Sequence, residues 1–186
     1  GRAGVGTVNL YTGALKFIHQ DVSWNGNLMP VSIEHIFEGM RSNAHYTRNG
    51  TEVITANYSN MLIGHGWKLN LQQSMVPITP SDFGPNNDCE YVYSDENGLA
   101  HFFKKKDTTD DKTLYIDEND EMLEYNPEER ILTRDGLRYQ FNNAGYLVEI
   151  VNQYDVKQEI TYDGSNRIVG VKDGAGREFK FTYSSN

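Results

Sequence analysis

Residues 141–183 have the sequence FNNAGYLVEIVNQYDVKQEITYDGSNRIVGVKDGAGREFKFTY, and a shift of 21 residues superimposes this segment on itself. The residues that coincide are Phe141, Tyr162 and Tyr183, Leu147 with Ile168, Ile150 with Val171, Asn152 with Asp173, and Ile160 with Phe181. Each unit runs from an aromatic residue through two turns and two strands to the next aromatic residue. One such hairpin cannot bury its apolar face alone, so we predict a sheet that grows by repetition.

Apolar and polar residues alternate with a period of two along much of the remaining chain. The clearest runs are 31–37, 67–71, 137–141 and 178–183. A half-buried antiparallel strand requires this period, because successive side chains leave opposite faces of a sheet. No stretch shows the period of an amphipathic helix. We therefore predict an all-β fold, a meander of antiparallel hairpins that forms an extended, curved sheet.

Turn residues separate these runs. Five pairs supply side chains that tolerate positive φ: Asn49-Gly50, Asn97-Gly98, Asp135-Gly136, Asp163-Gly164 and Asp173-Gly174. Such pairs are typical of the short loops that join antiparallel strands. Their spacing predicts short strands joined by tight hairpins.

Residues 77–88 have a different composition, rich in Pro, Asn and Asp. Because proline has no N–H to donate to a sheet ladder, we expect a loop in this segment. The loop divides the chain into an N-terminal β module at 1–76, which leads into the repeats, and hairpin repeats at 89–186. The two repeat units within the second part fall at about 141–161 and 162–183.

The charge balance and the cysteine count exclude several classes of function. Lys and Arg number 17 and Asp and Glu number 26, which gives a net charge of −9 and argues against nucleic acid as a partner. No apolar stretch approaches the roughly 20 residues of a membrane-spanning helix. The single Cys89 excludes an internal disulfide framework and a zinc site built from several cysteines.

Candidate catalytic and metal-binding residues are few, and we predict no catalytic, cofactor or metal site. His35, His45 and His65 lack the close spacing of zinc ligands. The acidic run 117–121 has carboxylates for Ca²⁺ but no EF-hand spacing, so a solvated hairpin tip is the favoured interpretation. Cys89 stands between Asp88 and Glu90, which disfavour the thiolate that a nucleophile needs.

Aromatic residues recur on the expected strands and leave two interpretations open. The residues concerned are Tyr91, Tyr93, Phe102, Phe103, Tyr139, Tyr146 and Tyr162. On an exposed face they would stack against sugars, which makes carbohydrate a candidate partner. Their recurrence at repeat positions favours the other interpretation, a core or cross-strand ladder.

The stretch 162–177 resembles the YD repeat of the Rhs family, with Tyr-Asp at its start, an Arg-Ile pair, an Asp turn and a Gly-Arg pair. It departs from that pattern at Asn166, where glycine is usual, and the preceding unit is degenerate. Two N-terminal segments, 9–15 and 64–69, are similar to segments that precede the repeats in this family. The residues that carry the resemblance are Thr12, Gly13, Gly64, Gly66, Trp67, Leu69, Phe141, Gly145, Leu147, Ile150, Tyr162, Asp163, Arg167, Ile168, Asp173, Gly176, Arg177, Phe181 and Tyr183.

The resemblance implies a non-catalytic structural module of a bacterial protein that is secreted or displayed at the cell surface. In this family the repeats wind into a β-shell around a C-terminal toxin or effector. The chain would then be a fragment from the start of the repeat region, with the rest of the polypeptide as its partner and any enzymatic activity elsewhere. Exposed strand edges would favour self-association. The alternative is a surface adhesin or a carbohydrate-binding β module.

Overall fold

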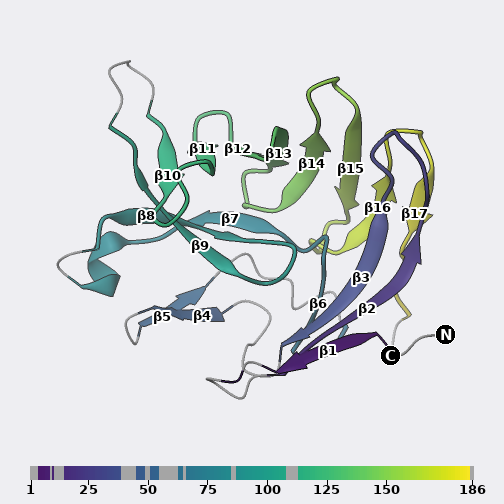
Figure 1. The fold of residues 1–186 in the computed structure, drawn as a ribbon, viewed down its shortest axis with the longest axis horizontal. Coiled ribbons are helices and arrows are strands. Elements are labelled where there is room, and N and C mark those ends of the chain that lie inside the picture. Colours follow the sequence, from purple (N-terminus) through teal and green to yellow (C-terminus); the bar gives the residue numbers. More distant parts are fainter. Residues whose placement is uncertain are drawn as a thin grey trace.

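The computed structural model describes residues 4–8, 10, 15–38, 45–48, 51–54, 63–64, 66–84, 87–107 and 113–184. These residues form an all-β fold, as predicted, with three antiparallel sheets of eleven, four and two strands (Figure 1). The described part contains no α-helix, and its one helical turn is the short 3-10 segment Pro80–Phe83.

The eleven-stranded sheet is a continuous meander, in which strands that are consecutive in sequence pair with one another. Its strands are β7 (Ser74–Pro77), β8 (Cys89–Ser94), β9 (Ala100–Lys105), β10 (Tyr115–Asp117), β11 (Glu124–Asn126), β12 (Ile131–Arg134), β13 (Leu137–Phe141), β14 (Leu147–Val151), β15 (Lys157–Tyr162), β16 (Ile168–Lys172) and β17 (Glu178–Lys180). The sheet is open, because its end strands β7 and β17 do not pair with each other.

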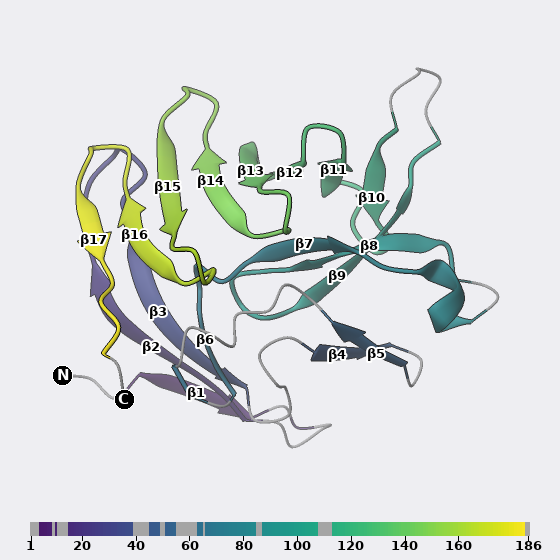
Figure 2. The same cartoon turned by 180° about the vertical axis from the view of Figure 1, so that it is seen from behind.

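The smaller sheets come from the N-terminal part of the chain. The four-stranded sheet has the order β1 (Val5–Val8), β2 (Leu15–Ser23), β3 (Ser32–Glu38) and β6 (Trp67–Leu69), and β4 (His45–Arg48) pairs with β5 (Thr51–Ile54). In both views β2 and β3 lie beside β16 and β17 (Figures 1 and 2). Strands from the two ends of the sequence therefore lie side by side in the fold.

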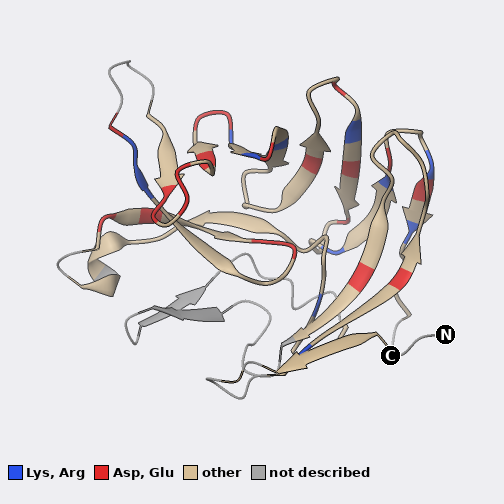
Figure 3. Cartoon of the chain, viewed as in Figure 1, with Lys and Arg blue, Asp and Glu red and all other residues tan. Residues whose placement is uncertain are grey.

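One hydrophobic core joins the two larger sheets. Cross-strand partners such as Tyr125 and Leu132, and Ile160 and Val171, turn their side chains to the same buried face of the long sheet. Val31, just before β3, and Leu69 of β6 also belong to this core. On the other face of the long sheet, charged residues alternate with these positions, as the red and blue bands on β14 to β17 show (Figure 3).

The 21-residue period of the sequence recurs in the register of the strands. Phe141 is paired with Leu147 and Tyr162 with Ile168, and in both hairpins the register shifts just before the aromatic residue. Because matching pairs are separated by the length of one unit, the two units build the same hairpin twice.

The segment 77–88, which was predicted as a loop, begins inside a strand, because Pro77 is the last residue of β7. β7 begins the long sheet at Ser74, and Pro77 still pairs with Tyr91 of β8. Proline is tolerated there because β7 is the end strand of its sheet. Ser74 also forms an isolated antiparallel bridge to Tyr146, the residue just before β14. The turn between β13 and β14 thus rests on the strand that begins the sheet.

Candidate functional site

A five-residue turn with one hydrogen-bond pattern joins the strands of the repeat. In the turn at 163–167 the carboxylate Oδ1 of Asp163 accepts hydrogen bonds from the backbone N–H groups of Ser165 and Arg167, at 2.9 and 3.0 Å. The Asp163 N–H donates to the Arg167 carbonyl at 2.9 Å. The first side chain of the turn thus caps the backbone groups that no strand partner reaches.

The same pattern occurs in five turns, at 95–99, 142–146, 152–156, 163–167 and 173–177. Their fourth residues have positive φ: Gly98 (83°), Gly145 (84°), Asp155 (57°), Asn166 (58°) and Gly176 (82°). The Asx-Gly pairs at 163 and 173 mark turns, but the residue with positive φ comes three positions after the aspartate. At Asp135-Gly136 both residues have positive φ, 51° and 74°.

In the last two turns an arginine follows the aspartate by four residues and binds its second oxygen. Arg167 Nε lies 2.7 Å from Asp163 Oδ2, and Arg177 Nε lies 2.8 Å from Asp173 Oδ2. Burial raises the pKa of Asp173, but the side-chain and backbone hydrogen bonds from Arg177 outweigh it and hold the pKa below its usual value. The Gly-Arg element of the repeat is therefore a turn clamp.

The aromatic residues that recur every 21 positions, Phe141, Tyr162 and Tyr183, anchor the repeat. Tyr162 donates its hydroxyl hydrogen to the Leu147 carbonyl at 2.7 Å, and Tyr183 donates to the Ile168 carbonyl, also at 2.7 Å. Acceptors and donors are both 21 residues apart. Phe141 holds the corresponding place in the first unit and is 1% exposed.

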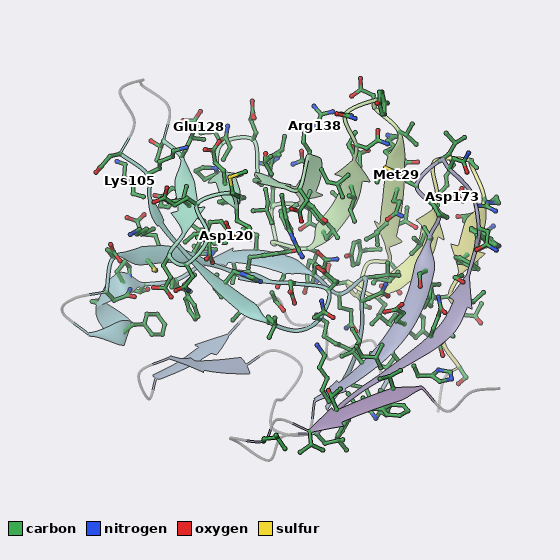
Figure 4. All side chains as sticks on the ribbon, in the orientation of Figure 1. Met29, Lys105, Asp120, Glu128, Arg138 and Asp173 are labelled. Carbon is green, nitrogen blue, oxygen red and sulfur yellow. The ribbon has the colours of Figure 1, made fainter. Side chains whose placement is uncertain are left out.

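Trp24, in the connection between β2 and β3, joins the N-terminal sheet to the repeats. Its ring stacks on Phe179 with centroids 3.7 Å apart, and the Arg177 guanidinium lies 4.8 Å from the Trp24 ring. Arg177 Nη1 also donates to the Asn25 carbonyl at 3.1 Å. Figure 4 shows Met29 of this connection close to Asp173 of the last turn. The sequence near Trp24 carries no signal of a contact so distant along the chain, so this residue was not predicted.

The structure describes the second of the two predicted N-terminal motifs, at 64–69 with the exception of residue 65. Trp67 packs against Phe37 and Phe17, with ring centroids 5.3 and 6.1 Å apart, and Leu69 is 1% exposed in the core. Gly64 and Gly66, which precede this strand, have φ of 101° and 79°. Thr12 and Gly13 lie outside the described residues.

A cluster of one half-buried histidine and two buried carboxylates links two hairpins that precede the repeats. His101 of β9 lies between Asp95 and Asp117, with Nε2 3.5 Å from Asp95 Oδ2 and Nδ1 3.6 Å from Asp117 Oδ2. The carboxylates of Asp117 and Asp95 raise the pKa of His101 to about 9, against the effect of burial. A charged imidazolium therefore holds the turns at 95–99 and 117–123 together. His101 was not predicted as a functional residue, because its two partners come from separate hairpins.

The other residues that were weighed as metal ligands or nucleophiles pack against neighbouring strands and turns. Asp117 begins the acidic run 117–121 but is buried, whereas Asp120 is exposed at the tip (Figure 4). Cys89 is fully buried, with its Sγ 3.6 Å from a Glu118 carboxylate oxygen. His35 contacts Asp21, and His65 lies outside the described residues. Within the described ranges, no group of three His, Cys, Asp or Glu residues could hold a metal ion.

The seven candidate stacking residues do not form an exposed aromatic face. Tyr93, Phe103, Tyr139 and Tyr146 are buried, and Tyr91, Phe102 and Tyr162 are half-buried. Several pack edge to face, as do Tyr93 and Phe141, whose ring centroids are 6.0 Å apart. This arrangement favours the cross-strand ladder over a sugar-binding surface.

No protein-family model matches the chain, and no curated protein matches it either. Within the described residues, no helix has both the length and the apolar character needed to cross a membrane.

Proposed function

We propose that the chain is a non-catalytic structural module of the Rhs/YD-repeat type. The observation that carries this proposal is the reuse of one hairpin at a 21-residue interval, with the same register and the same tyrosine-to-carbonyl bond. A sheet built in this way grows by a constant increment, because each unit buries its apolar face against the preceding one.

The two faces of this sheet fit a structural role in a protein shell better than a catalytic role. One of its faces is apolar and the other is covered with paired charges, such as Lys157 with Glu149 at 2.8 Å and with Glu159 at 2.9 Å. We propose that the module forms part of a β-shell that encloses or presents a C-terminal effector of the same polypeptide. In this proposal the parent protein is secreted or displayed at a bacterial surface.

The titratable groups of the described part support a structural role. Both ring nitrogens of His101 face carboxylates, so neither is free to take a proton from a nucleophile. The Cys89 thiol is fully buried beside Glu118. The contacts of His101 and Cys89 thus join neighbouring hairpins.

Adding one unit tests the repeat proposal. A chain extended after Tyr183 by a second copy of residues 163–183 should add two strands, raise the strand signal in circular dichroism and melt at a higher temperature. A scrambled copy of the same segment is the matched control. If the added unit is cleaved by protease as fast as the scrambled one, the proposal is wrong.

Cell fractionation tests the location. An antibody raised against this chain should detect the parent protein in the culture medium or on intact cells of the bacterium that makes it. Detection confined to the cytosol would contradict that part of the proposal.

A further inference from the structure

The turn at 95–99, between β8 and β9, contains the pair Asn97-Gly98 (Figure 1). Of the five turns that share one hydrogen-bond pattern, it alone has asparagine at its third position and glycine at its fourth. An asparagine amide loses ammonia when the backbone nitrogen of the next residue attacks it. Glycine leaves that nitrogen least hindered, because it has no Cβ. The pair is therefore the most labile chemical position in these turns.

The closed turn keeps the attacking nitrogen occupied. The Gly98 N–H donates to the Asp95 carbonyl at 3.1 Å, and Gly98 is buried. On either side of it, the N–H groups of Asn97 and Leu99 both donate to Asp95 Oδ1, at 2.9 and 2.7 Å. The nitrogen must lose its proton before it can attack, and a proton in a buried hydrogen bond is lost only when the structure opens, as in amide hydrogen exchange. The pair is therefore inert while the turn is closed.

Two cations from outside the turn hold it closed. His101 of β9 lies with Nε2 3.5 Å from Asp95 Oδ2, and the Asp95 side chain is almost fully buried. Arg134 of β12 binds both carboxylate oxygens of Glu96, at 2.9 and 3.1 Å. Opening the turn therefore breaks contacts with two other strands of the sheet.

We propose that Asn97-Gly98 is a deamidation site that the closed turn keeps inactive, and that opening of this turn sets its rate. In the open turn the Gly98 nitrogen gives its proton to water and attacks the side-chain carbonyl carbon of Asn97. The new N–C bond closes a five-membered succinimide, while the bond to the side-chain nitrogen breaks and that nitrogen takes up a proton and leaves as ammonia. Water then adds to either ring carbonyl, breaks its bond to the ring nitrogen, and leaves aspartate or isoaspartate at position 97.

Both products oppose reclosure of the turn. An aspartate at position 97 places a third carboxylate beside Asp95 and Glu96, with His101 and Arg134 as the cations that hold all three. An isoaspartate adds a methylene group to the main chain, so the N–H groups that now converge on Asp95 no longer match its oxygens. Each conversion is therefore a permanent record that the turn has opened.

The inference depends on the turn at 95–99 and not on the repeat proposal. The turns of the repeat units at 163–167 and 173–177 have no Asn-Gly pair. A chain that kept its amide at position 97 under all conditions would leave the repeat sheet and its proposed role untouched.

Peptide mapping by mass spectrometry of the full chain, incubated near neutral pH, tests the proposal. We expect residue 97 to convert at least about a hundredfold more slowly in the native chain than in the chain unfolded in guanidinium chloride. His101→Gln removes the cation beside Asp95 and should raise the native rate roughly tenfold, with no change in the unfolded rate. Arg134→Gln removes the second cation and should also raise the native rate, so it carries the same test if His101→Gln does not fold.

A matched variant in another turn separates local opening from general loss of stability. Arg167→Gln removes the cation of the turn at 163–167 and should leave the rate at residue 97 unchanged. Circular dichroism of each variant establishes that the sheet is intact. The proposal is wrong if the native and unfolded chains convert equally fast, if neither His101→Gln nor Arg134→Gln raises the native rate, or if Arg167→Gln raises it as much.

Discussion

The two repeat units, 141–161 and 162–183, share one backbone register but are anchored by different chemistry. The second unit begins with Tyr162, whose hydroxyl reaches the Leu147 carbonyl, and its first turn is clamped by Asp163 and Arg167. The first unit begins with Phe141, which is buried without a hydroxyl. The two units therefore have the same hairpin geometry, but side-chain hydrogen bonds stabilise the second unit and a buried ring stabilises the first.

The neighbour of each turn explains the difference. The turn at 142–146 rests on β7, where the Met75 N–H donates to the Gly145 carbonyl at 2.9 Å and the Leu147 N–H to the Gln73 carbonyl at 3.1 Å. Tyr146 is 5% exposed there, in the position that Arg167 holds in the second unit. An arginine at that position would be buried without an acidic partner. The unit that departs most from the repeat pattern is thus the one that packs on the start of the sheet.

Removal of the buried anchor should have the largest effect. Phe141→Ala deletes a ring that is 1% exposed and leaves a cavity, so we expect the free energy of unfolding to fall by about 3–5 kcal/mol. Tyr154→Ala in the same unit is the control, because Tyr154 is 76% exposed and its loss should be nearly neutral. Urea unfolding measures both. Equal effects would contradict the assignment of Phe141 as an anchor.

Two turn glycines with the same φ separate backbone strain from packing. A Cβ at Gly145 would lie 2.4 Å from the Met75 carbonyl oxygen, whereas a Cβ at Gly176 would meet nothing closer than Lys172 Cε at 4.0 Å. Gly176→Ala should therefore cost roughly 1 kcal/mol for its left-handed backbone, and Gly145→Ala about 3 kcal/mol. Similar losses in thermal or urea unfolding would show that the first turn does not rest on β7.

The strands and turns were predictable from the sequence because they depend on neighbours within one hairpin. Alternation placed Tyr139 and Phe141 on one face, and the repeat placed the turns that begin at Asn142 and Asp163. The contacts of Trp24 and His101 were not predictable, since each joins segments that local patterns do not connect. Arg177, for example, reaches a carbonyl 152 residues earlier in the chain. Tertiary packing decides such contacts, and a single sequence carries no local mark of them.

His101 holds a turn in a third way, which differs from both the arginine and the aromatic contacts. Asp95 begins the same type of turn as Asp163, but its cation is His101 rather than an arginine. His101→Gln should lower the free energy of unfolding by about 2 kcal/mol near pH 6, because two buried carboxylates lose their shared cation.

The pH dependence of this clamp has a definite sign. The pKa of His101 is raised from 6.5 to about 9, so its contribution is complete below pH 6.5 and is lost as the pH rises toward 9. The native chain should lose stability in that window, and the His101→Gln variant should not. Urea unfolding at several pH values checks this, and parallel curves for the two proteins would refute it.

The smallest effect should come from the anchor hydroxyls. Tyr162→Phe and Tyr183→Phe each remove one 2.7 Å hydrogen bond and keep the packed ring, so each should cost about 1 kcal/mol. Because the two contacts are equivalent, the two losses should match. A clear inequality between them would break the equivalence of the two units.

Amide hydrogen exchange of residues 137–181, followed by NMR, tests the repeat most directly. We expect protected amides to recur 21 residues apart, with the N–H groups of Asn142 and Asp163 protected alike, and those of Asn152 and Asp173 protected alike. A set of protected amides without this interval, or protection confined to one unit, would contradict the claim that one hairpin is built twice.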